Sequence, residues 1–152
     1  YLHRDQTDPR QLIADQLVAD IGDAGSVIAY NAGFEKRVLK ALQERFPVHQ
    51  TPLQGIIDRL WDLTGHIFRK HYTDYHFQGS NSIKSVVPVL VTDLSYDDLD
   101  ISSGDVAQVI WNDMLQTADA RTKQREADQR QAYCRQDTLA MVRIHEYLIE
   151  EF

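Results

Sequence analysis

Three side chains in this 152-residue sequence have the types and spacing that metal-assisted hydrolysis requires. Glu35 follows an apolar run at the start of an expected helix, and its carboxylate offers oxygen ligands for a divalent cation. Tyr133 and Asp137 are four residues apart, so on a helix both project from one face, about 5–6 Å from each other. A metal-bound carboxylate beside a phenol can hold and orient an attacking water. This pattern is typical of phosphoryl transfer, with Glu35 and Asp137 as metal ligands.

Each of these residues also has a plainer explanation. A carboxylate in a first helical turn, such as Glu35, offsets the helix dipole. Tyr133 and Asp137 fit a core tyrosine beside a solvent-facing aspartate, a pair that arises often by chance. Asn31 either caps a helix or contacts a substrate sugar or phosphate. Phe34 either packs in the core or stacks on a base.

Two further sets of polar residues are weaker candidates. Lys84 follows Ser82 near an expected helix start, where it either contacts a substrate phosphate or is a surface lysine. Asp58 and Asp62 are expected one helical turn apart, where they either add an acid to the site or form a solvated helix face.

Helices are expected to position these residues, together with one central strand. Hydrophobic periodicity and capping residues predict helices over residues 9–21, 31–45, 53–68, 82–90, 103–115 and 122–151. Ser82 is the expected cap of the fourth helix, and Ser102 or Ser103 that of the fifth. The apolar run at residues 26–30 predicts a strand that is buried on both faces.

Composition describes an ordinary globular chain and excludes few functions. Hydrophobic residues make up 43% of it and charged residues 26%, and the length is that of a single domain, residues 1–152. A net charge of −7 argues against a general nucleic-acid coating protein but not against a nuclease whose acids hold metals. No signal peptide or long apolar segment is present, and Cys134 stands alone, so a cytoplasmic location without membrane contact is expected.

Two segments together resemble motifs of the DnaQ-like (DEDD) 3'-5' exonuclease superfamily. They are residues 27–35, VIAYNAGFE, and residues 133–137, YCRQD. Residues 79–88, 94–96 and 133–141 extend the resemblance to an uncharacterised bacterial branch of that superfamily. Position 132 carries Ala132, where the histidine subclass would place its histidine, so the chain resembles the tyrosine subclass.

The resemblance implies an α/β, RNase H-like exonuclease fold that is helix-rich and truncated at its N-terminal strands. In that case the chain is the C-terminal part of such a domain. Glu35, Tyr133 and Asp137 are then catalytic, and Asn31, Phe34 and Lys84 contact the substrate. Glu35 and Asp137 help to hold two Mg²⁺ or Mn²⁺ ions, and the substrate is the 3' end of single-stranded DNA or RNA.

Two departures limit the activity that the resemblance implies. Glu35 stands where the superfamily usually has aspartate, and the first motif, an Asp-x-Glu on a strand, is absent from the sequence. Two of the four metal carboxylates are therefore missing, and Mg²⁺ requires near-ideal octahedral coordination. We expect the chain alone to be inactive, to hold few or no ions, and to form part of an active nuclease in a longer protein.

Other classes of function stay open at this point. A noncatalytic nucleic-acid-binding or protein-interaction module on the same fold would explain the glutamate and the negative charge. A helical protein unrelated to nucleases is a third possibility. A sheet edge left open by missing strands would permit a dimer.

Overall fold

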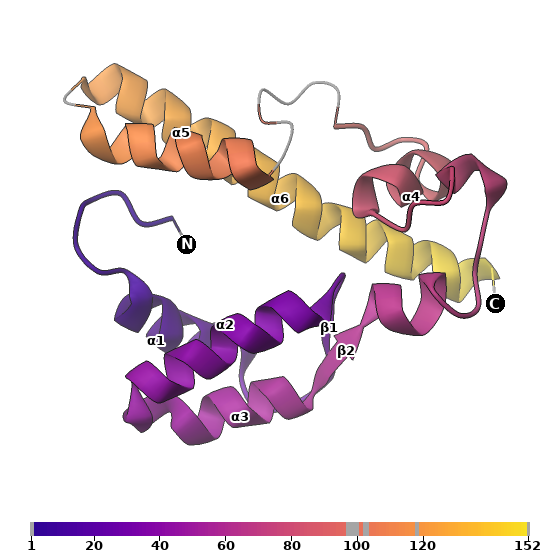
Figure 1. The fold of residues 1–152 in the computed structure, drawn as a ribbon, viewed down its shortest axis with the longest axis horizontal. Helices are drawn as coiled ribbons and strands as arrows, with labels where there is room; N and C mark the ends of the chain where they lie inside the picture. The colour runs from indigo at the N-terminus through magenta and orange to yellow at the C-terminus, as the bar shows by residue number, and fades with distance from the viewer. Residues whose placement is uncertain (1, 97–100, 102–103, 118, 152) are drawn as a thin grey trace. The chain divides into compact units, whose positions relative to one another are not determined.

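The computed structural model describes residues 2–96, 101, 104–117 and 119–151, and the chain divides into two compact units. The N-terminal unit comprises Thr7–Asp74. The C-terminal unit comprises Leu2–Gln6 together with the chain from Tyr75 onward. Figure 1 shows the elements of both units.

Helices dominate both units, and a small parallel sheet makes the chain a helix-rich α/β protein. The N-terminal unit contains α1 (Arg10–Ile21), β1 (Val27–Ala29), α2 (Ala32–Arg45), a 3-10 turn (Pro47–His49), α3 (Gln50–Asp58), β2 (Leu60–Asp62) and a π-helical turn (Thr64–Phe68). The C-terminal unit contains a 3-10 turn (Tyr75–Phe77), α4 (Ile83–Leu90), α5 (Gly104–Gln116) and α6 (Ala120–Glu151). No helix in the described parts of the chain is long and apolar enough to cross a membrane.

The strand expected at residues 26–30 is confirmed as β1. It pairs in parallel with β2, and Val27 lies opposite Leu60 and Ala29 opposite Asp62. Helices α2 and α3 make the crossover between the strands, as parallel pairing requires. Within the described residues β1 pairs with β2 alone, so a dimer through its other edge stays a prediction.

The core of the N-terminal unit lies between its three helices. Helix α3 packs beside α2, and α1 contacts both (Figure 1). The fully or nearly fully buried side chains of this core are Ala14, Leu39, Leu42, Leu53, Ile56 and Ile57. These residues recur at helical spacing on their elements, which is why periodicity predicts α1 and α2 correctly.

The helix expected over residues 53–68, with a short extended piece considered at residues 56–57, is correct only as far as Asp58, because β2 interrupts it. Helix α3 ends at Asp58, and Leu60–Asp62 takes its hydrogen bonds from β1. Beyond β2 the backbone N–H of Thr64 donates to the carbonyl of Tyr30, at 3.1 Å. Pairing with a distant strand has here overridden the local helical preference, as tertiary context often does.

Arg59 fixes the point where the chain leaves α3. Its guanidinium donates to the carbonyls of Gly22, Ala24 and Gly25, at 2.5–2.8 Å, in the loop that leads into β1. Gly22 and Gly25 have φ values of 62° and 75°, a left-handed conformation that glycine adopts without strain. The Arg59 side chain thereby connects the start of β2 to the loop that precedes β1.

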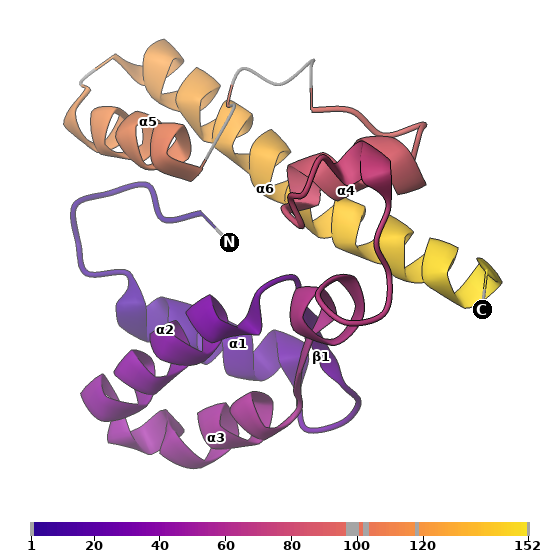
Figure 2. The same ribbon diagram turned by 45° about the vertical axis from the view of Figure 1, so that its right-hand side comes forward.

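The C-terminal unit is built on α6, a single helix of 32 residues. Helix α5 lies along its first half and α4 packs beside its second half (Figure 2). The indole N–H of Trp111 on α5 donates to the carbonyl of His3, at 3.2 Å, which joins the N-terminal segment to this unit. Ile144 and Ala140 on α6 are fully buried, so the second half of the helix supplies the apolar face that its sequence predicts.

The cap expected for α4 is confirmed, because the Ser82 side chain accepts the backbone N–H of Ser85 at 3.2 Å. The bond fixes the first turn of α4, which carries Lys84. Ser102 and Ser103, the expected caps of α5, lie outside the described residues.

Replacing Arg59 with alanine is expected to lower the free energy of unfolding of the N-terminal unit by about 2–3 kcal/mol, since three carbonyls lose a charged donor. Amide hydrogen exchange of α2 and α3 measures this locally. Arg69→Ala, at an exposed arginine of the same unit, is the matched control and should change exchange little. Equal protection in the two variants would contradict the role given to Arg59.

Candidate functional site

The candidate residues form two groups, one in each unit. Asn31, Phe34 and Glu35 lie at the junction of β1 and α2 in the N-terminal unit. Lys84, Tyr133 and Asp137 belong to the C-terminal unit, where α4 and α6 carry them. The structure brings the members of each group together within their own unit.

Glu35 lies in the first turn of α2, directly after β1, as the sequence predicts. It is the charged residue in the lining of an apolar pocket of about 200 Å³ formed by α1, β1, α2 and α3. Its Oε2 atom is buried and accepts no hydrogen bond from any residue that the structure describes. A buried carboxylate oxygen without a partner is unfavourable, so this atom is suited to accept a cation.

Asn31 does not cap α2 through its side chain, and Phe34 does not pack in the core, so the plainer explanation of each residue is wrong. Asn31 occupies the cap position of α2, but its side chain makes no capping hydrogen bond and is exposed. Phe34 is 57% exposed rather than packed in the core, with the Arg37 guanidinium 5.5 Å from the centre of its ring. Both side chains therefore face solvent beside Glu35, where they are accessible to a ligand.

In the C-terminal unit, four side chains from three segments meet around one turn of α6. Tyr133 and Asp137 lie on the same face of the helix, as their spacing predicts. The hydroxyl of Tyr96 donates to Asp137 Oδ1 at 2.9 Å. The ammonium of Lys84 lies 5.3 Å from the ring centres of both Tyr96 and Tyr133. A carboxylate, two phenols and a cation thus form one polar cluster, which we call the Asp137 cluster.

Tyr133 is the most buried member of this cluster, at 8% exposure. Burial raises the pKa of its phenol, and with the smaller effect of the negatively charged Asp137 carboxylate the value reaches about 12. The phenol is therefore neutral across the physiological pH range. Its hydroxyl can donate a hydrogen bond, but it cannot act as a base.

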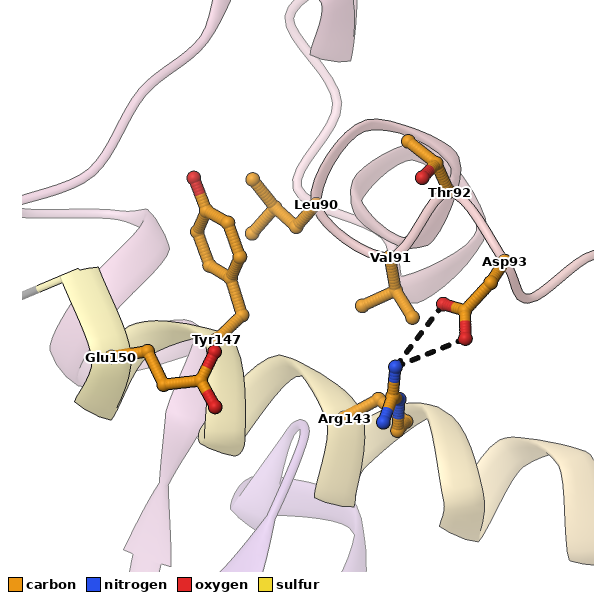
Figure 3. A pocket seen from close by; sticks show the side chains of 7 residues that line it. All are labelled: Leu90, Val91, Thr92, Asp93, Arg143, Tyr147 and Glu150. Carbon is orange, nitrogen blue, oxygen red and sulfur yellow. Dashed lines mark hydrogen bonds and ion pairs between the residues drawn. The ribbon is translucent and has the colours of Figure 1, made fainter.

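The segment between α4 and Tyr96 is held against α6 at two more points. The Gln136 side-chain amide donates to the carbonyl of Ser95, at 2.8 Å. Farther along the helix, the Arg143 guanidinium donates to both carboxylate oxygens of Asp93, at 3.0 and 3.3 Å (Figure 3). Figure 3 also shows the pocket of about 140 Å³ between the end of α4 and α6, beside this ion pair. These contacts position Tyr96 relative to Asp137.

Asp58 and Asp62 are not paired on one helix face, because Asp58 ends α3 and Asp62 ends β2. Asp62 Oδ1 accepts the backbone N–H of Gly65 at 2.8 Å, and a Cβ on Gly65 would meet Asp62 Oδ2 at 2.9 Å. Asp62 therefore caps the turn after β2. Asp58 accepts a hydrogen bond from Gln54, one turn earlier on α3.

These residues supply only some of the ligands that a divalent ion needs. Glu35 and Asp137 supply carboxylate oxygens, the ligand type that Mg²⁺ and Mn²⁺ prefer. Among the described residues there is no group of three histidine, cysteine, aspartate or glutamate side chains that could hold an ion. The carboxylates present thus fit as individual ligands of a larger site.

Tyr96 is the member of the Asp137 cluster to which the sequence assigned no role. It precedes Asp137 by 41 residues, and no periodicity or spacing rule relates the two positions. The one sequence signal is indirect, since residues 94–96 belong to the stretch that resembles the DnaQ-like branch.

Comparison with known proteins gives a family but no characterised relative. Neither the curated proteins nor the solved structures include a match to this chain. The model of one protein family, described as a domain of unknown function (DUF2779), matches residues 1–82. This match includes Asn31, Phe34 and Glu35 and ends just before Lys84. It covers more than half of the sequence, and the chain therefore belongs to the DUF2779 family.

Proposed function

We propose that the chain forms part of a metal-dependent 3'-5' exonuclease-like domain that hydrolyses phosphodiesters of single-stranded DNA or RNA. In this proposal the α/β architecture belongs to an RNase H-like fold. It assigns Glu35 and Asp137 as metal ligands and Tyr133 as the group that orients the attacking water. The chain alone is expected to be inactive, because the Asp-x-Glu motif of such sites is not in its sequence.

The Asp137 cluster is the observation that carries this proposal. If Tyr133 and Asp137 were four residues apart only by chance, there would be no reason to find a lysine and a second phenol beside them. Lys84 nevertheless lies over both rings, and the Tyr96 hydroxyl bonds to Asp137. The first turn of α4 adds backbone N–H groups that favour anions near Lys84. A phosphate close to Lys84 would place its phosphorus within reach of a water held by Asp137 and Tyr133.

Tyr133 has a defined part in this arrangement. Its raised pKa keeps the hydroxyl protonated and hydrogen-bonded to Asp137, so in the proposal it orients water together with that carboxylate and does not remove a proton. The proton of the attacking water therefore has to pass to another acceptor, for which the carboxylates are the available groups. Water then forms the new bond to phosphorus, and the bond to the 3' oxygen of the preceding nucleotide breaks.

The N-terminal group supports the same function from the other unit. Glu35 has a buried oxygen that no described residue hydrogen-bonds, and Phe34 and Asn31 are exposed beside it. In the proposal Phe34 stacks on the terminal base and Asn31 contacts the sugar or phosphate. Divalent ions held with the help of these carboxylates would stabilise negative charge on the phosphoryl oxygens.

A noncatalytic nucleic-acid-binding or protein-interaction module is the alternative. The net charge of −7 favours it, as does Glu35 at a position where the superfamily usually has aspartate. In that case Lys84 and Phe34 would still contact a partner, while Asp137 would be needed only for structure. Substitution of Asp137 separates the two possibilities.

Asp137→Asn in the full-length protein is expected to lower the rate of metal-dependent digestion of 3'-labelled oligonucleotides by at least about 100-fold. The amide keeps the shape of the side chain but removes the charge that binds a cation. Digestion of DNA and RNA oligonucleotides with Mg²⁺ or Mn²⁺ measures this, and a chelator should abolish it.

Asp128→Asn is the matched control, because Asp128 is an exposed aspartate on the same helix and contacts only Gln124 among the described residues. It should digest the oligonucleotides at the wild-type rate. If Asp137→Asn also does so, Asp137 is not catalytic and the nuclease proposal is wrong.

The pKa of Tyr133 gives a prediction at high pH. The difference between ultraviolet titrations of the wild type and Tyr133→Phe should show one tyrosine that ionises at pH about 12, above its usual value of 10.0. The folded state holds this proton more tightly than the unfolded state, so the stability it contributes is present below pH 10 and declines as pH approaches 12. Wild-type stability should therefore fall more steeply than that of Tyr133→Phe above pH 10. A difference curve centred on pH 10 would contradict the buried, Asp137-adjacent position of this phenol.

A further inference from the structure

We propose that Tyr96 is a positioning residue that fixes the orientation of the Asp137 carboxylate for the reaction. The inference rests on the proposed function, because it assumes that Asp137 acts through its carboxylate. It adds a residue that the two sequence motifs do not contain.

The contact itself selects one oxygen of Asp137. The Tyr96 hydroxyl donates to Oδ1 at 2.9 Å, and the bond is partly buried. A hydrogen bond from a neutral donor to a carboxylate is stronger than one between neutral groups. The Tyr133 phenol also hydrogen-bonds to this carboxylate, and with Oδ1 engaged by Tyr96 rotation about the last side-chain bond is restricted further. Partners of this kind commonly orient the carboxylates that bind metals.

The hydroxyl of Tyr96 is held at its place by the backbone around it. The Gln136 amide bonds to the carbonyl of Ser95, the residue before Tyr96. Asp93, two residues earlier, is ion-paired with Arg143 (Figure 3). Both partners lie on α6, the helix that carries Asp137, so the donor and its acceptor share one frame. Such support is what a positioning group requires.

The ring of Tyr96 has a second contact that does not depend on its hydroxyl. The Lys84 ammonium lies 5.3 Å from the centre of this ring and at the same distance from that of Tyr133. Cation–π attraction holds Lys84 over the rings of the two tyrosines that hydrogen-bond to Asp137. Phenylalanine at position 96 keeps the ring and this contact but removes the hydrogen bond. The two roles of Tyr96 can therefore be separated by one substitution.

Tyr96→Phe in the full-length protein is expected to lower kcat by between about 10-fold and 100-fold, the usual effect of losing a group that orients a metal ligand. KM and the melting temperature should change little, because Lys84 and the ring stay in place. Mn²⁺ affinity, measured by calorimetry without substrate, should fall in the same variant. Tyr75→Phe is the matched control, since Tyr75 is 84% exposed in the same unit, and should match the wild type in each measurement.

A double-mutant cycle in the unliganded protein gives a readout that is independent of activity. If the hydroxyl acts through Asp137, Tyr96→Phe should cost stability in the wild type but little in the Asp137→Ala background, which lacks an acceptor for the hydroxyl. Additive losses of stability would overturn the inference, because the hydroxyl would then act elsewhere.

The kinetic outcomes distinguish this inference from the proposed function. If Asp137→Asn loses activity while Tyr96→Phe keeps the wild-type kcat and Mn²⁺ affinity, only the role of Tyr96 is overturned. If Asp137→Asn is fully active, the proposed function fails and the inference fails with it. A loss of kcat in Tyr96→Phe that merely follows a lowered melting temperature would show a structural role and would also overturn the inference.

Discussion

Helix α6 imposes the constraint on which the C-terminal unit and its candidate site both depend. It must present an apolar surface to α4 and α5 and at the same time carry Tyr133 and Asp137. Ala140 and Ile144 meet the first requirement by full burial. Tyr133 serves both requirements. Its ring is nearly buried in the apolar surface, and its hydroxyl lies beside Asp137 in the candidate site. The helix thus fixes the site through the same packing that stabilises the unit.

The carboxylates of Asp137 and Glu35 differ in the partners that surround them. The Asp137 cluster pairs its carboxylate with a hydroxyl donor and a nearby ammonium. Glu35 instead keeps one oxygen buried against apolar side chains, without a hydrogen bond from the described residues. A carboxylate that is left in this condition is unfavourable unless a cation or a donor reaches it. A purely structural first-turn acid would be expected to face solvent instead.

Local sequence patterns predicted the parts of the structure that local interactions determine. The apolar spacing of α1 and α2, the apolar run of β1 and the Ser82 cap all act within a few residues, and each was confirmed. Strand β2 was missed because its hydrogen bonds come from β1, far away in the sequence. Tyr96 was missed for the same reason, since its partner Asp137 lies 41 residues along the chain. The plainer roles of Asn31 and Phe34 failed because capping and burial depend on side-chain directions that spacing does not specify.

The central claim is the proposal that Glu35 and Asp137 are both metal ligands of a nuclease. A crystal structure of that protein grown with Mn²⁺, with the ions located by their anomalous scattering, tests it most directly. The account predicts Mn²⁺ within about 2.5 Å of a carboxylate oxygen of each residue. Mn²⁺ bound elsewhere, or Glu35 and Asp137 carboxylates more than about 10 Å apart, would contradict it, because ions of a two-metal site lie only about 3.5–4 Å from each other.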